Sequence, residues 1–291
     1  MSEQPAICEH SYAEELRVAA LHAARSAADL LRSTFRTSVN AEHKTNTHDL
    51  VTEIDRRSQQ IITESLLTAV PGSWVLGEEK ISAHSGQQSP GSVQWIVDPI
   101  DGTSNFVHGI AFFCISIAAA IDEQLVAAVI IDPISGDEFT ANLDTALLND
   151  VQLNPAMRPA QSQANLMTDY PGAESLEQDG ELALQLFGQW IQDFATVRRK
   201  VSAALALAHV AAGWCDATIG FDTKVWDVAA GAHLVRMAHG TFRGLSFGQA
   251  DLADHECPGF IAQGPGADYP SLDRAAQHIH QLRTRGTAEE V

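Results

Sequence analysis

The segment 95–106, Trp-Ile-Val-Asp-Pro-Ile-Asp-Gly-Thr-Ser-Asn-Phe, constrains the fold of this chain more than any other feature. Residues 95–97 predict a buried strand, and Pro99, which has no backbone N–H group, is expected to end its pairing. A helix is expected to begin at Gly102 or Thr103. The chain therefore has to pass from a buried strand to a helix within a few residues, with acidic side chains at the junction.

The expected elements before residue 150 differ from those after it. The first part predicts helices at 12–36 and from Thr52 to the Pro71-Gly72 pair, strands at 74–76, 95–97, 112–121, 125–131 and 138–141, and a hairpin at 122–124. The second part alternates expected strands at 166–168, 217–219 and 241–245 with helices at 181–190, 202–212, 228–238 and 273–285. We therefore expect residues 1–150 to form an N-terminal α+β half with an antiparallel sheet, and 151–291 a C-terminal α/β half.

Composition limits the class of protein. Of the 291 residues 45% are hydrophobic, so the chain can bury a large core. Its formal net charge of −19 argues against nucleic acid or an anionic membrane as a partner, because both are bound through basic patches. We find no apolar run that could span a membrane and no secretory pattern at the start, so a cytoplasmic protein is expected.

The cysteines support the same interpretation. Cys8, Cys114, Cys215 and Cys257 are widely spaced, and none belongs to a Cys-x-x-Cys pair. This spacing favours reduced thiols over a disulfide framework or a zinc site. His255-Glu256-Cys257 lacks the partner spacing of a zinc site as well.

The acids of the 95–106 segment suggest metal chemistry. Asp98, the carbonyl of Ile100 and Asp101 offer hard oxygen ligands on one short turn, which suits magnesium. The first N–H groups of the following helix, from Gly102 and Thr103, are expected to form an anion site beside the cations. A phosphate group could thus be held by metal on one side and by backbone on the other.

Three further acidic elements are candidates for the same site. Glu78 follows a short expected strand in Gly77-Glu78-Glu79, Asp227 lies in Trp226-Asp227, and Asp55 lies near a helix start. Each aspartate near a helix start could instead be a helix cap. Glu79 is interpreted as supporting or surface rather than as a direct ligand.

These elements resemble the inositol monophosphatase family, within the lithium-sensitive, metal-dependent phosphatases. The family pattern is an early acid, Gly-Glu-Glu, Asp-Pro-Ile-Asp-Gly-Thr and Trp-Asp-x-Ala-x-Gly, and all four occur here in order between Lys44 and Gly231. The resemblance implies an α+β / α/β fold, a layered α-β-α-β-α sandwich of the inositol monophosphatase / fructose-1,6-bisphosphatase type. It also implies a homodimer.

The resemblance implies a role for each matching residue. Glu78, Asp98 and the Ile100 carbonyl match ligands of a first Mg2+, and Asp98, Asp101 and Asp227 match ligands of a second. A third, weaker metal would use Glu78 mainly through water. The implied catalytic residues are Asp55, Thr103 and Glu78, of which Asp55 and Thr103 match the pair that activates the attacking water. Lys44 matches a lysine on a mobile loop. The matched substrate-side positions are Gly102, Thr103, Ser202, Ala203, Gly220 and Lys44.

The implied activity is Mg2+-dependent hydrolysis of a small phosphate monoester by water that two or three metals activate. Alternatives with the same chemistry are histidinol phosphate, a sugar bisphosphate, a 3'-phosphonucleotide or NADP as substrate. An alternative of another class is a regulatory binding protein on this fold.

Two departures from the family pattern concern the substrate. Gly220 stands where inositol phosphatases carry a glutamate seven residues before the Trp-Asp aspartate, and Asp222 could replace that glutamate only if the loop shifts. Val201-Ser202-Ala203, preceded by Lys200, replaces the usual Gly-Ser/Thr-Ala, and Lys224 adds a cation. We expect a leaving group other than inositol, with a carboxylate or a further phosphate as options.

Two remaining polar features keep alternative interpretations. His108 is interpreted as polar packing near the site rather than as a catalytic base. The basic cluster 198–200, Arg-Arg-Lys, is interpreted as a solvated strand end, with a contact to a second anionic group of the substrate as the alternative.

Overall fold

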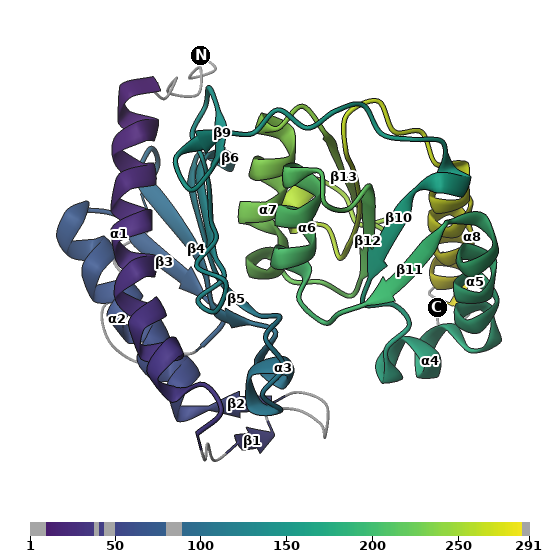
Figure 1. Cartoon of the computed structure of the whole chain (residues 1–291), viewed down its shortest axis with the longest axis horizontal. Coiled ribbons are helices and arrows are strands. Elements are labelled where there is room, and N and C mark those ends of the chain that lie inside the picture. Colours follow the sequence, from purple (N-terminus) through teal and green to yellow (C-terminus); the bar gives the residue numbers. More distant parts are fainter. Residues whose placement is uncertain (1–9, 38–40, 44–49, 80–88, 287–291) are drawn as a thin grey trace.

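The computed structural model describes residues 10–37, 41–43, 50–79 and 89–286. Five layers follow one another in Figure 1: a pair of helices, a sheet, a second pair of helices, a second sheet and an outer group of helices. The predicted layered α-β-α-β-α arrangement is confirmed. None of the described helices is both long and apolar enough to cross a bilayer.

The first sheet has seven described strands in the order β3-β4-β5-β6-β7-β8-β9. They are β3 (Trp74–Gly77), β4 (Val93–Asp101), β5 (Cys114–Ile121), β6 (Gln124–Ile131), β7 (Glu138–Ala141), β8 (Ala146–Leu148) and β9 (Val151–Gln152). The β3–β4 pair is parallel and the other pairs are antiparallel, so the prediction of an antiparallel sheet holds except at this edge. The predicted hairpin is present as well, because Asp122 and Glu123 both have positive φ and Ile121 pairs with Gln124.

Two helices cover the outer face of this sheet, α1 (His10–Thr34) and α2 (Glu53–Ala69). Alanines and leucines of α1 pack with alternate residues of β5, including Ile115 and Ile117, to form one apolar core. A small antiparallel pair, β1 (Ala41–His43) and β2 (Leu50–Thr52), precedes α2. Thr52, where the helix was predicted to begin, caps α2, because its hydroxyl accepts from the N–H groups of Ile54 and Asp55.

Pro99 does not end β4, contrary to the prediction. The strand continues to Asp101, and its register against β5 shifts between Asp98 and Asp101. Pro99 therefore lies in an irregularity of the ladder, where its missing N–H group is tolerated. The short helix α3 (Thr103–Val107) follows directly, with Gly102 as its N-cap at φ 96°.

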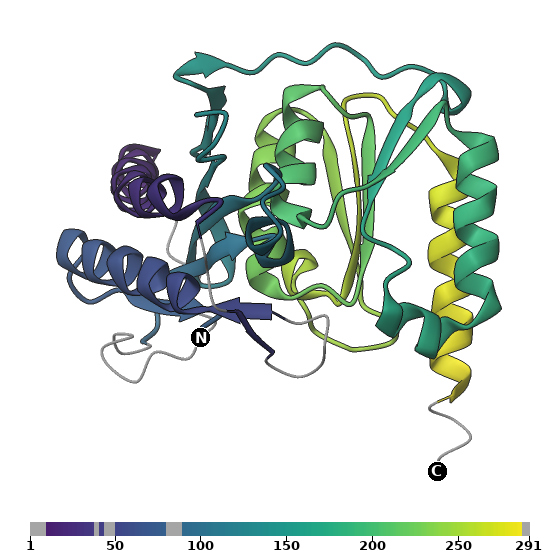
Figure 2. The ribbon, with the colours of Figure 1, turned by 60° about the horizontal axis from the view of Figure 1, so that its bottom comes forward.

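The second sheet has five described strands in the order β11-β10-β12-β14-β13. They are β10 (Asn165–Thr168), β11 (Thr196–Arg199), β12 (Ala217–Phe221), β13 (Thr241–Leu245) and β14 (Gly259–Gln263). The first three in spatial order are parallel, whereas β14 runs antiparallel to both of its neighbours. The chain reaches this sheet through the segment after β9, which runs along one side of the middle layer (Figure 2).

The middle layer consists of α6 (Ala203–Ala212) and α7 (Val225–Met237), which pack against both sheets in one apolar cluster. Eight of the ten residues of α6 are buried, as expected for a helix that is apolar on all sides. The outer layer consists of α4 (Ala173–Asp179), α5 (Glu181–Asp193) and α8 (Pro270–Gly286), and the short turns are η1 (Gln161–Gln163) and η2 (Asp254–Glu256). The elements that the sequence analysis did not predict include α4, β1, β2, β8, β9 and β14.

Candidate functional site

Asp98 lies three residues before the end of β4, where the first sheet meets the middle layer. Its side chain is 2% exposed, and its Oδ1 accepts the backbone N–H of Ile100 at 2.9 Å. Burial raises the pKa of the Asp98 carboxyl well above its usual value, and the negative charges of Glu78, Asp101 and Asp227 raise it further. The structure thus brings the four predicted carboxylates into electrostatic contact.

Asp101 joins β4 to the start of α6. Its Oδ2 accepts the hydroxyl of Ser202 at 2.6 Å and the backbone N–H of Ala204 at 2.8 Å. Burial raises the pKa of Asp101 to about 6, although the Ser202 hydrogen bond acts against that rise. Ser202 therefore contacts Asp101, and Ala203 lies between the two donors in the sequence, while their substrate roles stay predictions.

Asp227 lies in the first turn of α7 and serves as part of its cap. The backbone N–H of Lys224 donates to Asp227 Oδ2 at 2.7 Å. Burial raises the pKa of Asp227 well above its usual value, and the charge of Asp101 adds to the effect. The capping interpretation is correct for one oxygen, and the same carboxylate also contributes charge to the cluster.

Asp55 and Thr103 meet on the α2 side of the cluster. Thr103 Oγ1 donates to Asp55 Oδ1 at 3.0 Å and lies equally close to the carbonyl oxygen of Ile100. Asp55 Oδ2 accepts from the backbone and hydroxyl of Thr52 at 2.8 and 2.5 Å, and the Asp55 side chain is fully buried. Burial raises the pKa of Asp55 to about 6, which is suitable for an acid that exchanges a proton near neutral pH.

Glu78 is positioned through the backbone around it. Its N–H donates to the carbonyl of Val97 at 3.1 Å, which extends the β3–β4 pairing. The Gln59 side chain bonds both the N–H and the carbonyl of Glu79, at 2.7 and 2.6 Å. A Cβ on Gly77 would come within 2.3 Å of the Gln59 side chain, so glycine at this position leaves room for Gln59 of α2 to bond Glu79. Glu79 is buried, which excludes the surface position that the sequence left open.

The donor set fits a hard divalent cation by its chemistry. Carboxylates and a carbonyl oxygen are the ligands that Mg2+ prefers, and a cation would relieve the mutual repulsion that adds to the effect of burial on these pKa values. In the described part of the chain, no three His, Cys, Asp or Glu side chains are grouped closely enough to hold a metal as they stand. The carboxylates act on one another electrostatically, and their ligand roles stay predictions.

A turn at 200–202 closes the cluster from the second half of the chain. Asn105 Nδ2 donates to the carbonyls of Lys200 and Val201, at 2.7 and 3.1 Å, and to that of Phe112 at 2.7 Å. A Cβ on Gly102 would lie 3.0 Å from the Val201 carbonyl. Gly102 thus provides both the positive φ and the close approach that the turn requires.

Gly220 does not lie in a loop. It is buried in β12 opposite Phe260 of β14, and a Cβ on Gly220 would meet the Phe260 ring at 2.5 Å. The ring also stacks on Phe242, with centroids 5.3 Å apart. Asp222 bonds the guanidinium of Arg283 at 2.7 and 3.0 Å, so it is engaged with α8.

The basic residues at 198–200 each contact a group of the chain itself. Arg198 donates to Thr196 Oγ1 and Asn165 Oδ1, Arg199 Nε donates to the Asp169 carbonyl, and Lys200 lies over the ring of Phe112 at 5.4 Å. All three basic side chains are exposed. These contacts favour the interpretation of 198–200 as a strand end. Lys44 and Cys8 lie outside the described residues.

Two residues near the cluster were missed in the sequence. Asn105 belongs to the motif segment but was given no role, and Asp169 follows the expected strand 166–168. The position of Asp169 at the carboxyl end of a parallel strand was a usable signal, because ligands bind at such ends.

His108 bonds the Ser104 carbonyl at 2.7 Å, which agrees with packing rather than catalysis. Cys114, Cys215 and Cys257 are buried and not disulfide-bonded.

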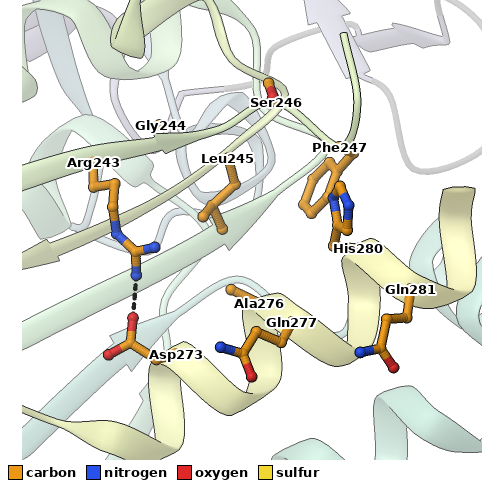
Figure 3. Close-up of a pocket in the computed structure, with 10 residues that line it drawn as sticks. All are labelled: Arg243, Gly244, Leu245, Ser246, Phe247, Asp273, Ala276, Gln277, His280 and Gln281. Carbon is orange, nitrogen blue, oxygen red and sulfur yellow. Dashed lines mark hydrogen bonds and ion pairs between the residues drawn. The ribbon is translucent and has the colours of Figure 1, made fainter.

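A separate pocket of about 500 Å³ lies between β13 and α8 (Figure 3). Its lining includes the Arg243–Asp273 ion pair, Phe247 and His280, and none of the predicted site residues. The pocket therefore offers positions for control variants outside the carboxylate cluster.

Comparison with known proteins assigns the family. The inositol monophosphatase family model matches residues 13–281. The chain belongs to the inositol monophosphatase family. It is 38% identical to the Nus factor SuhB of Pseudomonas aeruginosa over 223 residues, covering 76% of this chain and 82% of that protein. It is also 38% identical to the inositol-1-monophosphatase of Rhizobium meliloti over 193 residues, covering 66% of this chain and 71% of that protein.

A solved structure agrees with the family assignment. The extragenic suppressor protein SuhB of Bartonella henselae superposes with a TM-score of 0.79 at 30% identity, covering 89% of this chain and 97% of that one. The family resemblance and the fold class predicted from the sequence are thus confirmed.

Proposed function

We propose that this protein is a Mg2+-dependent hydrolase of small phosphate monoesters. The observation that carries the proposal is the Asp55–Thr103 pair, held 3.0 Å apart at the edge of a carboxylate cluster. A buried acid bonded to a hydroxyl can withdraw a proton, and the adjacent carboxylates can hold cations that attract a phosphate. Membership of the inositol monophosphatase family supports the same chemistry.

The residues of the chain divide the work in the proposed reaction. Glu78, Asp98, the Ile100 carbonyl, Asp101 and Asp227 would hold two or three Mg2+ ions. Bound Mg2+ would supply positive charge to the phosphate oxygens and make a water molecule easier to deprotonate. Thr103 orients that water through its hydroxyl, and Asp55 receives the proton. The backbone N–H groups of Gly102 and Thr103 bind phosphate oxygens beside the cations.

The substrate is tested by phosphate release from a panel. The panel is inositol 1-phosphate, histidinol phosphate, fructose 1,6-bisphosphate, 3'-phosphoadenosine 5'-phosphate and NADP, each with Mg2+ and with chelator. Mg2+-dependent release from at least one compound, absent in Asp98→Asn, supports the proposal. Gly220, which has no side chain and is covered by Phe260, argues against a preference for inositol 1-phosphate.

A second candidate function comes from the relatives named Nus factor SuhB. This chain could act as a Nus factor, as a regulatory binding protein whose role does not need phosphate release. The test is whether Asp98→Asn replaces the wild-type chain in an assay of transcription by its own host's RNA polymerase. Full replacement favours the binding role, whereas loss of function favours the enzyme. The predicted absence of a nucleic-acid partner stays a prediction.

We also propose that residues 1–150 and 151–291 form two halves of one homodimeric protein. The chain crosses between the two sheets only after β9, and each sheet has its own outer apolar cluster, while the cluster around α6 and α7 joins the two halves. Light scattering of the purified chain measures the dimer directly, and a monomer mass at micromolar concentration contradicts it.

A further inference from the structure

Asp169 stands at the carboxyl end of β10, beside the candidate site. Thr168 of β10 pairs in parallel register with Arg199 of β11, so Asp169 and Lys200 are the next residues on neighbouring strands. In open α/β sheets, ligands bind outside the carboxyl ends of such strands. Asp169 is half-buried.

The carboxylate of Asp169 fills a backbone site at the start of α6. The N–H of Val201 donates to Asp169 Oδ1 at 2.5 Å, and the N–H groups of Lys200 and Ser202 also donate to this carboxylate. Successive N–H groups that point to one place attract an anion. Here that anion is part of the chain itself, and Val201 adopts φ 58° to complete the turn, which is rare for a β-branched residue.

The same turn touches the proposed reacting centre. Ser202 donates to Asp101 at 2.6 Å, and the charge of Asp169 raises the pKa of Asp101. Burial raises the pKa of Asp169 itself, whereas the Val201 N–H and the Arg199 charge act in the other direction. Asp169 is thus within electrostatic reach of the cluster.

The layers decide which part of the substrate faces Asp169. The Asp55–Thr103 pair approaches the cluster from α2, and the Ser202 turn approaches it from α6. These helices cover opposite faces of the first sheet (Figure 1). Because the attacking and leaving oxygens of phosphoryl transfer lie roughly in line, attack from the α2 side directs the leaving group toward the 200–202 turn.

We propose that Asp169 is a specificity-determining residue, selecting phosphate monoesters whose leaving group carries a positively charged amine over those with a second anionic group. The proposal rests on the phosphatase function proposed above. It reverses the sequence-based expectation of an anionic leaving group, because Asp169 already occupies the backbone groups that a second anion would use.

Arg199 is the strongest competing charge. Its guanidinium donates to the backbone carbonyl of Asp169 at 2.9 Å rather than to the carboxylate, and it is exposed. Solvent and salt screen an exposed charge more than a half-buried one. Of these two charges, the Asp169 carboxylate is therefore the less screened at this turn.

The test uses three esters of the same length that differ in charge: 2-aminoethyl phosphate, 2-hydroxyethyl phosphate and carboxymethyl phosphate. The readout is the ratio of kcat/KM for the amine to that for the carboxylate, measured with Mg2+ in each variant. Intrinsic reactivity cancels when the ratio is compared between variants. We expect Asp169→Asn and Asp169→Ser to lower the ratio about tenfold, mainly through KM.

Matched variants separate this effect from folding. Asp216 also holds a backbone N–H, that of Asn165 at 2.7 Å, but at the opposite end of β10, so Asp216→Asn should leave the ratio unchanged. Arg199→Gln should keep or increase the ratio. Circular dichroism melting identifies any variant that fails to fold.

The outcomes are distinct. A lower ratio in both Asp169 variants, with Asp216→Asn unchanged, supports the proposal. An unchanged ratio in the Asp169 variants overturns it, as does a wild-type preference for the carboxylate that Arg199→Gln abolishes. If neither the three esters nor 4-nitrophenyl phosphate release phosphate, the proposed function fails, and this inference fails with it.

Discussion

Thr103 connects Asp55 to the turn of the metal-ligand motif, because its hydroxyl lies 3.0 Å from both Asp55 Oδ1 and the Ile100 carbonyl oxygen. A hydroxyl has one proton, so Thr103 can donate to Asp55 while its oxygen remains available as an acceptor. This arrangement is the one that a proton relay from water to Asp55 requires. It also explains why Asp55, although a capping residue of α2, has a second oxygen directed toward the site.

The relay predicts a graded loss of activity at Thr103. Thr103→Ala removes the hydroxyl and should lower kcat about 10²–10⁴-fold, the usual contribution of positioned proton transfer. Thr103→Ser keeps the hydroxyl and should retain most of the activity. Steady-state phosphate release from both variants measures the difference, and equal activity in the two would contradict the relay.

Asp98→Asn should stabilise the protein in the absence of metal. The charges of Glu78, Asp101 and Asp227 all act on the buried Asp98 carboxyl, so its removal relieves repulsion. We expect the free energy of unfolding to increase by about 1–2 kcal/mol at pH 7.5 with chelator present. Urea unfolding of wild type and variant measures it, and a less stable variant would argue against mutual repulsion.

The stabilising effect of Mg2+ should depend on pH. Burial raises the folded-state pKa of Asp55 and Asp101 to about 6 from 3.8. The folded state therefore binds these two protons more tightly than the unfolded state, and protonation of the two groups stabilises the fold. Their contribution is present below about pH 4 and is lost as the pH rises through about 6. Mg2+ should therefore raise Tm more at pH 7.5 than at pH 5. A larger rise at pH 5 would contradict this sign.

Gly220→Ala should destabilise the protein, because the new Cβ meets the Phe260 ring at 2.5 Å. Overpacking of this kind costs about 1–3 kcal/mol. Gly220→Ala should cost less stability when it is introduced into the Phe260→Leu variant than when it is introduced into the wild type. Denaturant melts of the four proteins form the required cycle, and additive effects would show that the ring is not the obstacle.

Val201→Gly should stabilise the fold without loss of phosphate release. Val201 has φ 58°, a conformation that glycine adopts without steric cost. Relief of this strain should raise the free energy of unfolding by about 1 kcal/mol, and the greater entropy of glycine in the unfolded chain offsets part of that gain. Gly136→Ala, at φ 81° in open space, is the reverse control and should lose stability. A destabilised Val201→Gly variant would contradict the assignment of strain.

Much of the site could be predicted because its residues are contiguous in the sequence. The segment 95–106 specified the strand, the turn and the helix, and only the ladder beyond Pro99 differed from expectation. Helix periodicity placed α1 and α2 within a few residues of their ends. These features depend on local conformation and on the alternation of apolar side chains.

The substrate side could not be predicted in the same way. Gly220 gains its meaning only from Phe260, which is 40 residues later and becomes its neighbour through antiparallel pairing. Asp169 likewise meets Val201 only because β10 and β11 are parallel neighbours. Strand order in a mixed sheet is set by packing between distant segments, which one sequence does not specify.

Phosphate release during Mg2+ titration of the wild type, Asp98→Asn and the control Gln281→Ala tests the central claim most directly. Gln281 lines the pocket beside α8, outside the carboxylate cluster (Figure 3). We predict saturable Mg2+-dependent release from the best substrate of the panel by the wild type and by Gln281→Ala, and none by Asp98→Asn. Release that persists in chelator, or that Asp98→Asn retains, would contradict the account.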